Sequence, residues 1–330
     1  MQAHLGGLRP RSAWFSYFGA VGGCLDYLGI DVSDAWLYGG TGWGFVFCMS
    51  ADVDPAAPIA WDGLCVNACS PTNPGVVARL QPNLGYKTRC VCGCPHGGNR
   101  ELDQARKQAW DLVRASIDQG SPCIGYELAD PGFFVIAGYT DDEYLFVSSE
   151  VVEGTADRLR SVRWSETTPI VGWVRVQAIL PGTPAEDATV VREALRAVTD
   201  RMNREPDGGM FVVGLSAYDL WAAALESGAA GGFGHRHSAA AYAELRSRAV
   251  GFLREAKERL PGHADGLFDE AAEHYAVAAD KLQALHALHP PMDVEDERIG
   301  SEEAASLVRG AAAAERRGFP LLARIAEALA

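Results

Sequence analysis

The chain has 330 residues, of which 48% are hydrophobic and 22% are charged, a composition that is typical of soluble globular proteins and a length that allows two domains. It carries 29 basic residues against 43 acidic ones, so its net charge is −14. An acidic surface of this kind repels nucleic-acid phosphates and anionic lipid, and we therefore expect neither nucleic acid nor a membrane as a partner.

The N-terminal stretch MQAHLGGLRPRSAW lacks the apolar core of a signal peptide. The run FFVIAG at 133–138 is far shorter than the ~20 residues that cross a bilayer. These observations predict a cytoplasmic protein. In that compartment the eight cysteines are expected to be mostly reduced.

The first half of the chain mixes a few helices with several strands. Apolar residues at helical spacing predict a helix over 14–29, although Gly19, Gly22 and Gly23 weaken it. Glycines in such a helix are typical of places where another backbone or a ligand comes close. The other predictions are a short helix before a strand at 44–49, a mainly loop segment at 51–98, an amphipathic helix at 99–118, and strands at 121–128, 132–140, 142–151 and 170–180.

The second half is rich in alanine, leucine, arginine and glutamate and has helical periodicity almost throughout. PGTPAED, at 181–187, is the best candidate for a domain boundary. We therefore predict an α+β domain over 12–182 and an all-α helical domain over 186–330. The predicted helices of the second domain are 186–203, 216–228, 238–259, 264–288 and 301–329.

Several phrases occur in the order that is found in a known family. These are LYGGTGWGFVF, GSPCIGYEL and VIAGYTDDEYLFVSS in the first half, then GLSAYDLWAAALE and GFGHRHSAAAYAELRSRAVGFLREA in the second. Over most of residues 14–285 the chain resembles the butirosin-biosynthesis-protein-H-like family. The resemblance implies a papain-like (cysteine-proteinase-like) domain, related to bacteriocin-processing cysteine peptidases, with a helical companion domain. It also implies an ancestral acyltransferase activity on a carrier-bound aminoacyl group.

The catalytic residues of that family do not carry over. The resemblance puts the nucleophilic cysteine at Ser16, the histidine at Gly132 or Phe133, and the third residue near Ser149 or Glu150. A serine without a neighbouring base stays protonated and is a poor nucleophile. We therefore predict a degenerate catalytic triad and a cleft between the two domains that binds a small amide, a peptide or a carrier-bound acyl group.

Two alternatives remain open. The first is an active acyltransferase or amide hydrolase that uses Ser16 or Cys24, with a base supplied by Glu127 or His235. For Cys24 and Cys123, burial within apolar segments is the favoured interpretation. Glu127 follows Tyr126 in a predicted strand, where alternation slightly favours a solvent-facing carboxylate over a general acid or base in a pocket.

The second alternative is a zinc-binding protein. Thiolates and imidazoles suit zinc, which takes four ligands. The spacing is not that of ordinary structural zinc sites, so small thiols in a loop remain the favoured interpretation and no cofactor is required. The candidate ligands are Cys65, Cys69, Cys90, Cys92, Cys94 and His96.

Aromatic and histidine side chains supply the candidate ligand-binding residues. His235 and His237 are predicted in a glycine-rich loop that precedes a helix. A loop of this kind can bind an anion, and core packing is at least as plausible for the aromatic residues. The candidates are Trp14, Tyr126, Tyr139, Trp221 and His237.

Overall fold

A computed structural model describes residues 2–50, 76–93, 99–130, 132–148, 158–167, 173–203, 211–290 and 298–330. The predicted α+β class is confirmed: an antiparallel sheet is combined with many helices. The chain divides into two compact units. The first contains residues up to Val32 and the Leu84–Pro184 segment, and the second contains the helices from Ala185 to Ala330.

The division differs from the contiguous domains that we predicted. Residues 33–50 and 76–83 pack with the helical unit, although they precede most of the sheet in the sequence. The two units are therefore interleaved along the chain. The first unit ends at Pro184, within the PGTPAED segment.

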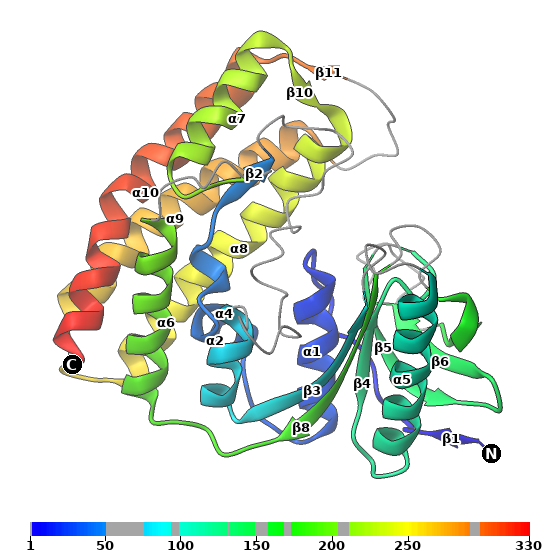
Figure 1. Ribbon diagram of the computed structural model, residues 1–330. Coiled ribbons are helices and arrows are strands. Elements are labelled where there is room, and N and C mark those ends of the chain that lie inside the picture. Colours follow the sequence, from blue (N-terminus) through cyan, green and yellow to red (C-terminus); the bar gives the residue numbers. More distant parts are fainter. Residues whose placement is uncertain are drawn as a thin grey trace. The chain divides into compact units, whose positions relative to one another are not determined.

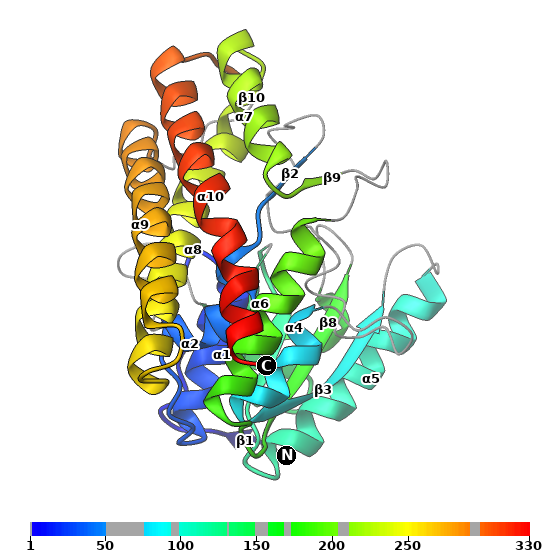
Figure 2. The same cartoon turned by 90° about the vertical axis from the view of Figure 1, so that its left-hand side faces the viewer.

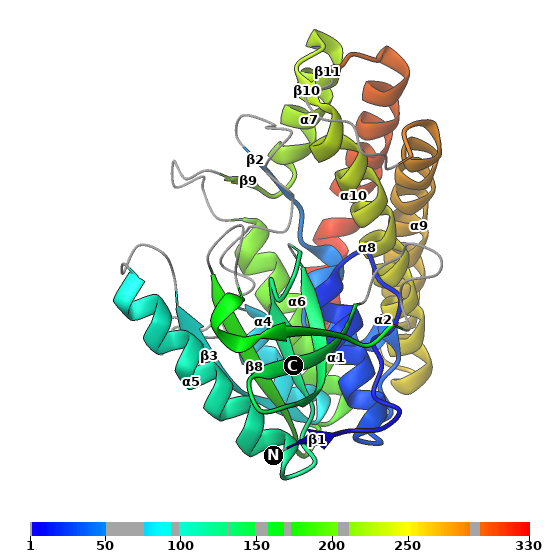
Figure 3. The same cartoon turned by 90° about the vertical axis from the view of Figure 1, so that its right-hand side faces the viewer.

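In the first unit an antiparallel sheet lies between two helices (Figures 1 and 3). The strand order is β3-β8-β4-β5-β6-β7, and β1 pairs with one end of β5. Helix α1 packs on the face that carries Phe133 and Gln177, and α5 packs on the face that carries Gly93. The elements are β1 (Ala3–His4), α1 (Ser16–Tyr27), β3 (Tyr86–Gly93), α5 (Asn99–Ile117), β4 (Cys123–Tyr126), β5 (Phe133–Tyr139), β6 (Glu143–Ser148), β7 (Arg160–Arg163) and β8 (Val174–Pro181).

Helices α8, α9 and α10 are the longest elements of the second unit, and α9 packs against both α8 and α10 (Figure 2). Ser33 caps α2 and Ser301 caps α10: each hydroxyl accepts a backbone N–H three residues later. The elements are α2 (Asp34–Gly40), the 3-10 helix Trp43–Phe45, β2 (Cys48–Ser50), α4 (Val76–Leu80), α6 (Asp187–Met202), β9 (Phe211–Val213), α7 (Ser216–Ser227), β10 (Ala230–Gly231), α8 (Gly232–Arg259), α9 (Asp265–Leu288), β11 (Arg298–Ile299) and α10 (Glu302–Ala328).

Most of the predicted elements are confirmed, and the differences concern short segments. Part of the predicted loop at 51–98 forms α4 and β3, and the short strands β1, β7, β9, β10 and β11 are not among the predicted elements. The predicted strand at 44–49 is a 3-10 turn followed by β2. Helix α8 starts at Gly232, so the predicted loop around His235 is helical, and Gly232, Gly234 and His235 are buried in it. No helix of the described residues is long and apolar enough to cross a membrane.

Candidate functional site

The candidate site lies at the first residue of α1. Phe15 is extended and Ser16 begins the helix, with a half-buried side chain. The Ser16 Oγ accepts a hydrogen bond of 2.9 Å from the backbone N–H of Phe133, at the start of β5. A methyl group on Gly132 would lie 3.5 Å from the same Oγ. The structure thus brings together the two positions to which the family resemblance assigned the nucleophile and the histidine.

Backbone, and not an imidazole, faces the Ser16 hydroxyl at this position. The described residues of the first unit include one histidine, His4, which pairs with Gly138. Gly138 is five residues along β5 from Phe133, or about 17 Å at the rise of a strand. His4 therefore does not serve Ser16 as a base. Ser149 and Glu150, the expected third position, lie outside the described residues.

The sheet beside Ser16 carries aromatic and basic side chains in one cross-strand row. Phe133 on β5 pairs with Tyr126 on β4, which pairs with Arg175 on β8. The Phe133 ring contacts the rings of Tyr17 and Tyr126, with centroids 5.0 and 5.2 Å apart. The Arg175 Cζ lies 5.9 Å from the Phe133 centroid. Of the predicted ligand-binding aromatics, Tyr126 thus lies at the site, while Trp14 is half-buried just before α1.

Glu127 is buried, and the predicted solvent-facing orientation is wrong. Its side chain has no exposed surface. It follows β4 with a φ of 53°, a left-handed conformation that is uncommon for glutamate. Its backbone N–H donates to the carbonyl of Gly132, so the turn that holds this carboxylate is the turn that faces Ser16. Alternation failed here because the strand ends at Tyr126, and the φ of Glu127 redirects its side chain.

Cys24 and Cys123 are fully buried, as predicted. Burial raises the pKa of the Cys24 thiol well above its usual value, and it raises the pKa of Cys123 to about 12. A reactive cysteine needs the opposite, an accessible thiol with a lowered pKa. The structure therefore disfavours Cys24 as a displaced nucleophile.

We expect an iodoacetamide probe to leave Cys24 unmodified in the folded protein, from neutral to mildly alkaline pH. A thiol loses its proton only above its pKa, and burial raises the pKa of Cys24, so the thiolate fraction stays small over this range. Peptide mass spectrometry checks the outcome, with protein denatured in guanidinium as the positive control. Alkylation of Cys24 in the folded protein, at a rate near that of the denatured control, would contradict the assignment.

Of the six predicted metal ligands, Cys90 and Cys92 lie among the residues that the structure describes. Cys90 and Cys92 lie on β3 and, two residues apart, project from the same face. Both are disulfide-bonded, which differs from the reduced thiols that we expected. Their Sγ atoms are 3.9 Å apart, so the two are not bonded to each other. Among the described residues, no group of three potential ligands is placed to hold a metal ion. The remaining candidates, outside the described residues, are Cys65, Cys69, Cys94 and His96.

His235 is occupied within the helical unit. The His235 ring is buried, and its Nδ1 accepts a hydrogen bond from the Trp221 indole N–H. Its Nε2 lies 2.9 Å from the Nδ1 of His289. Burial, followed by the neighbouring His289 and Arg236, lowers the pKa of His235 to about 3. With both ring nitrogens engaged, it has no lone pair for the proton of Ser16. The structure disfavours His235 as a base.

The other predicted ligand-binding residues pack inside their own units. His237 is half-buried on α8 and stacks on Phe233, and burial lowers its pKa to about 4. Trp221 is fully buried in the helical unit. Tyr139 packs against Trp110 beneath α5 and donates a hydrogen bond to Asp118. Nothing places Tyr139 or Trp221 at a ligand.

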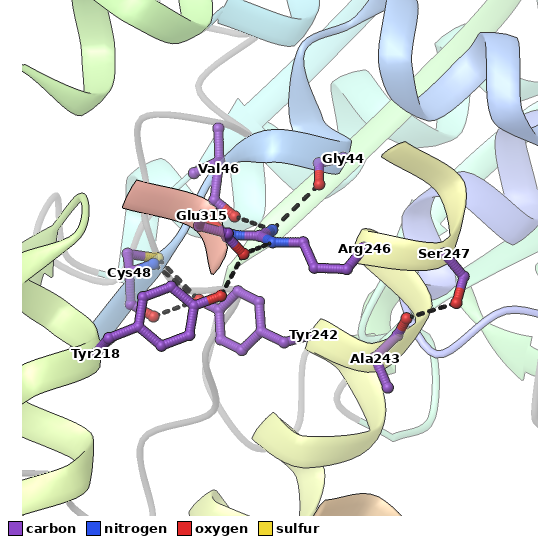
Figure 4. A network of polar contacts seen from close by, with 9 residues as sticks. All are labelled: Gly44, Val46, Cys48, Tyr218, Tyr242, Ala243, Arg246, Ser247 and Glu315. Carbon is purple, nitrogen blue, oxygen red and sulfur yellow. Dashed lines mark hydrogen bonds and ion pairs between the residues drawn. The ribbon is translucent and has the colours of Figure 1, made fainter. Parts of the chain in front are cut away.

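The sequence analysis missed a buried polar network in the helical unit (Figure 4). Arg246 on α8 forms a two-pronged ion pair with Glu315 on α10, and both side chains are fully buried. Tyr218 on α7 donates to the same carboxylate. Arg246 also donates to the carbonyls of Gly44 and Val46, at 3.1 and 2.9 Å. Its donors are satisfied by the fold, so we regard this network as structural.

A sequence signal for this network existed. Arg246 follows Tyr242 by four residues and precedes Val250 by four, and Glu315 follows Ala311 by four, so each charge lies on an apolar stripe. Opposite charges on the inner faces of two helices indicate a buried pair. Arg175 carried a weaker signal, because alternation in its strand also fits a solvent-facing arginine.

No family model matches the chain, and a search of the curated proteins found no match.

Proposed function

We propose that the first unit is a papain-like domain with a degenerate triad, which binds a small amide, peptide or carrier-bound acyl compound at Ser16 without cleaving it. The observation that carries the proposal is the hydrogen bond from the Phe133 N–H to the Ser16 Oγ. It puts a helix N-terminus opposite the start of a strand, the arrangement in which a papain-like enzyme holds its cysteine and histidine. The order of α1 before the antiparallel strands agrees with the same fold.

The expected lack of turnover follows from the contacts of Ser16. Its Oγ accepts from a backbone N–H, which leaves its own proton without a receiving imidazole among the described residues of this unit. A neutral hydroxyl attacks a carbonyl slowly, because the nucleophile must lose its proton as the bond forms. The hydroxyl and the aromatic side chains beside it remain suitable for binding an acyl group.

A second candidate function is acyl transfer from Ser16, and the burial of Glu127 favours it. In this reaction the Ser16 Oγ attacks a thioester carbonyl, its proton passes through the Glu127 carboxylate to the departing thiol, and an acyl-serine forms. An amine or water then attacks this ester, takes the acyl group and gives up a proton that returns to the Ser16 Oγ. A buried carboxylate in an uncommon backbone conformation is typical of functional sites. The turn that carries Glu127 is also hydrogen-bonded to Gly132, beside Ser16.

We expect the full-length protein to bind short acyl thioesters of N-acetylcysteamine saturably, and to remain unmodified at Ser16. Binding is followed by tryptophan fluorescence, and covalent modification by intact-protein mass spectrometry. Gly132→Leu should weaken binding by about tenfold or more, because the leucine side chain would fill the space in front of the Ser16 hydroxyl. A tenfold change corresponds to about 1.4 kcal/mol of binding free energy. Gly6→Leu is the matched control, since nothing lies within 4 Å of that position.

The outcomes separate the candidates. An acyl adduct on Ser16 that forms and decays with time, and that Glu127→Gln suppresses, would establish the second candidate. Absence of binding to every acyl compound and peptide tested would contradict both.

A further inference from the structure

Ser16 has a backbone hydrogen-bond donor beside it, the Phe133 N–H, and the buried carboxylate of Glu127 lies on the neighbouring turn. Ser16 begins a helix of 12 residues, and the positive end of the helix dipole lies at this terminus. Its Oγ accepts the Phe133 N–H, and its own proton is available for donation to a ligand. Both features favour a ligand that presents oxygen acceptors or negative charge.

Arg175 adds a buried cation to the same place. Arg175 is only 7% exposed. The chain around it is acidic overall, with a net charge of −14. The Arg175 guanidinium lies 5.9 Å from the ring centroid of Phe133, the residue whose N–H reaches Ser16. The guanidinium also acts on two neighbouring hydroxyls. Burial raises the pKa of Tyr17 to about 12, burial and the nearby Glu127 carboxylate raise the pKa of Tyr126 further, and Arg175 opposes both shifts. Arg175, Tyr17, Tyr126 and Phe133 therefore form one cluster.

Gln177 supplies a second donor. It projects from the same face of β8 as Arg175, two residues further on, and is completely buried. Its Oε1 lies 3.4 Å from the hydroxyl of Tyr17, in the first turn of α1. Its Nε2 has no hydrogen-bond partner in the part of the chain that the structure describes. Buried polar groups are rarely left in this state, so this amide N–H requires an explanation, and a ligand acceptor supplies one.

We propose that the ligand of this site carries a carboxylate in addition to its acyl group, and that Arg175, assisted by Gln177, determines this specificity. A guanidinium has five N–H donors in a planar fork, so it pairs with a carboxylate while it keeps contacts within the chain. The amide of Gln177 then donates to the same anion or to the neighbouring carbonyl. This inference rests on the proposed function, because it assigns the chemical class of the ligand at that site.

The experiment compares two probes that differ only in charge. The succinyl thioester of N-acetylcysteamine carries a free carboxylate, and its methyl ester is neutral and nearly the same size. We expect the full-length wild-type protein to bind the succinyl compound at least about tenfold more tightly than the ester, as measured by calorimetry, because a hydrogen bond between charged groups contributes more than a neutral one. Added salt should reduce the preference.

Variants then test the role of Arg175. Arg175→Met should reduce the preference for the carboxylate to about twofold or less, and Arg175→Lys should retain part of it, since lysine keeps the charge but loses the fork. Gln177→Met should weaken the binding of both probes by a smaller factor. Circular dichroism verifies that each variant is folded. The comparison in the wild-type protein does not depend on any variant.

Each result has a distinct meaning. Equal binding of the succinyl compound and its ester to the wild type would overturn this inference and leave the proposed function standing. A carboxylate preference that survives in folded Arg175→Met would overturn the assignment to Arg175. If neither probe nor any uncharged thioester binds, the proposed function fails and this inference fails with it.

Discussion

We expect Glu315→Gln to lower the free energy of unfolding of the helical unit by about 3–5 kcal/mol, the usual loss when one partner of a buried ion pair is removed. The substitution preserves the shape of the side chain but leaves the guanidinium of Arg246 buried without an opposite charge. Urea denaturation followed by circular dichroism measures the change. The loss should appear in the transition of the helical unit, because α7, α8 and α10 all contribute to the network (Figure 4).

The matched control lies on two of the same helices. Asp219 on α7 and Arg316 on α10, each next to a member of the network, form an ion pair of 2.7 Å with 63% and 44% of their side chains exposed. Asp219→Asn should cost less than about 1 kcal/mol, since an exposed pair is well solvated. The double variant Arg246→Met/Glu315→Leu should lose less than Glu315→Gln, because it leaves no unpaired charge. Equal losses for Glu315→Gln and Asp219→Asn would show that the buried pair has no special role.

The second large expected effect is the loss of stability when Gly23 in α1 is substituted. The chain segment that precedes α1 passes close to the backbone of Gly23. A Cβ on Gly23 would lie 1.8 Å from the carbonyl oxygen of Arg9 and 2.7 Å from the Cα of Pro10. The segment is held in place, because the Arg11 N–H donates to the carbonyl of Gly19 and the Arg11 side chain pairs with Asp26. Gly23→Ala should therefore destabilise the first unit by about 2–3 kcal/mol, the typical cost of overpacking. Alanine's better helix propensity, about 1 kcal/mol, offsets only part of this.

Gly22→Ala is the control for that prediction. A Cβ on Gly22 would meet the Cδ of Arg11 at 2.7 Å, a side-chain atom that a change of rotamer can displace, whereas a Cβ on Gly23 would meet backbone atoms. The helix propensity gained by alanine should keep the net change within about 1 kcal/mol. Thermal and urea unfolding of the two variants give the comparison. If Gly23→Ala proves as stable as the wild type, the backbone of residues 9–10 does not constrain α1 as described.

The sequence by itself determined much of the architecture, because periodicity and turn residues act over a few positions. The α+β class, α5, the strands β4, β5, β6 and β8, and the helices from α6 to α10 follow from the spacing of apolar side chains. The close backbone approach at Gly23 was also foreseeable, since a glycine in the middle of a helix is costly unless something lies against it.

Only the tertiary structure decided which chemical groups meet. Ser16 and Phe133 are 117 positions apart, and Arg246 and Glu315 are 69 apart. No local pattern specifies such distances. Whether a charged residue on a strand or helix faces water or the interior depends on what packs over it. That packing buried Glu127, Arg175 and Arg246, three charges that an alternation or a helical stripe also allows at the surface. Contacts between distant segments therefore fixed the candidate site, while local spacing fixed the elements that carry it.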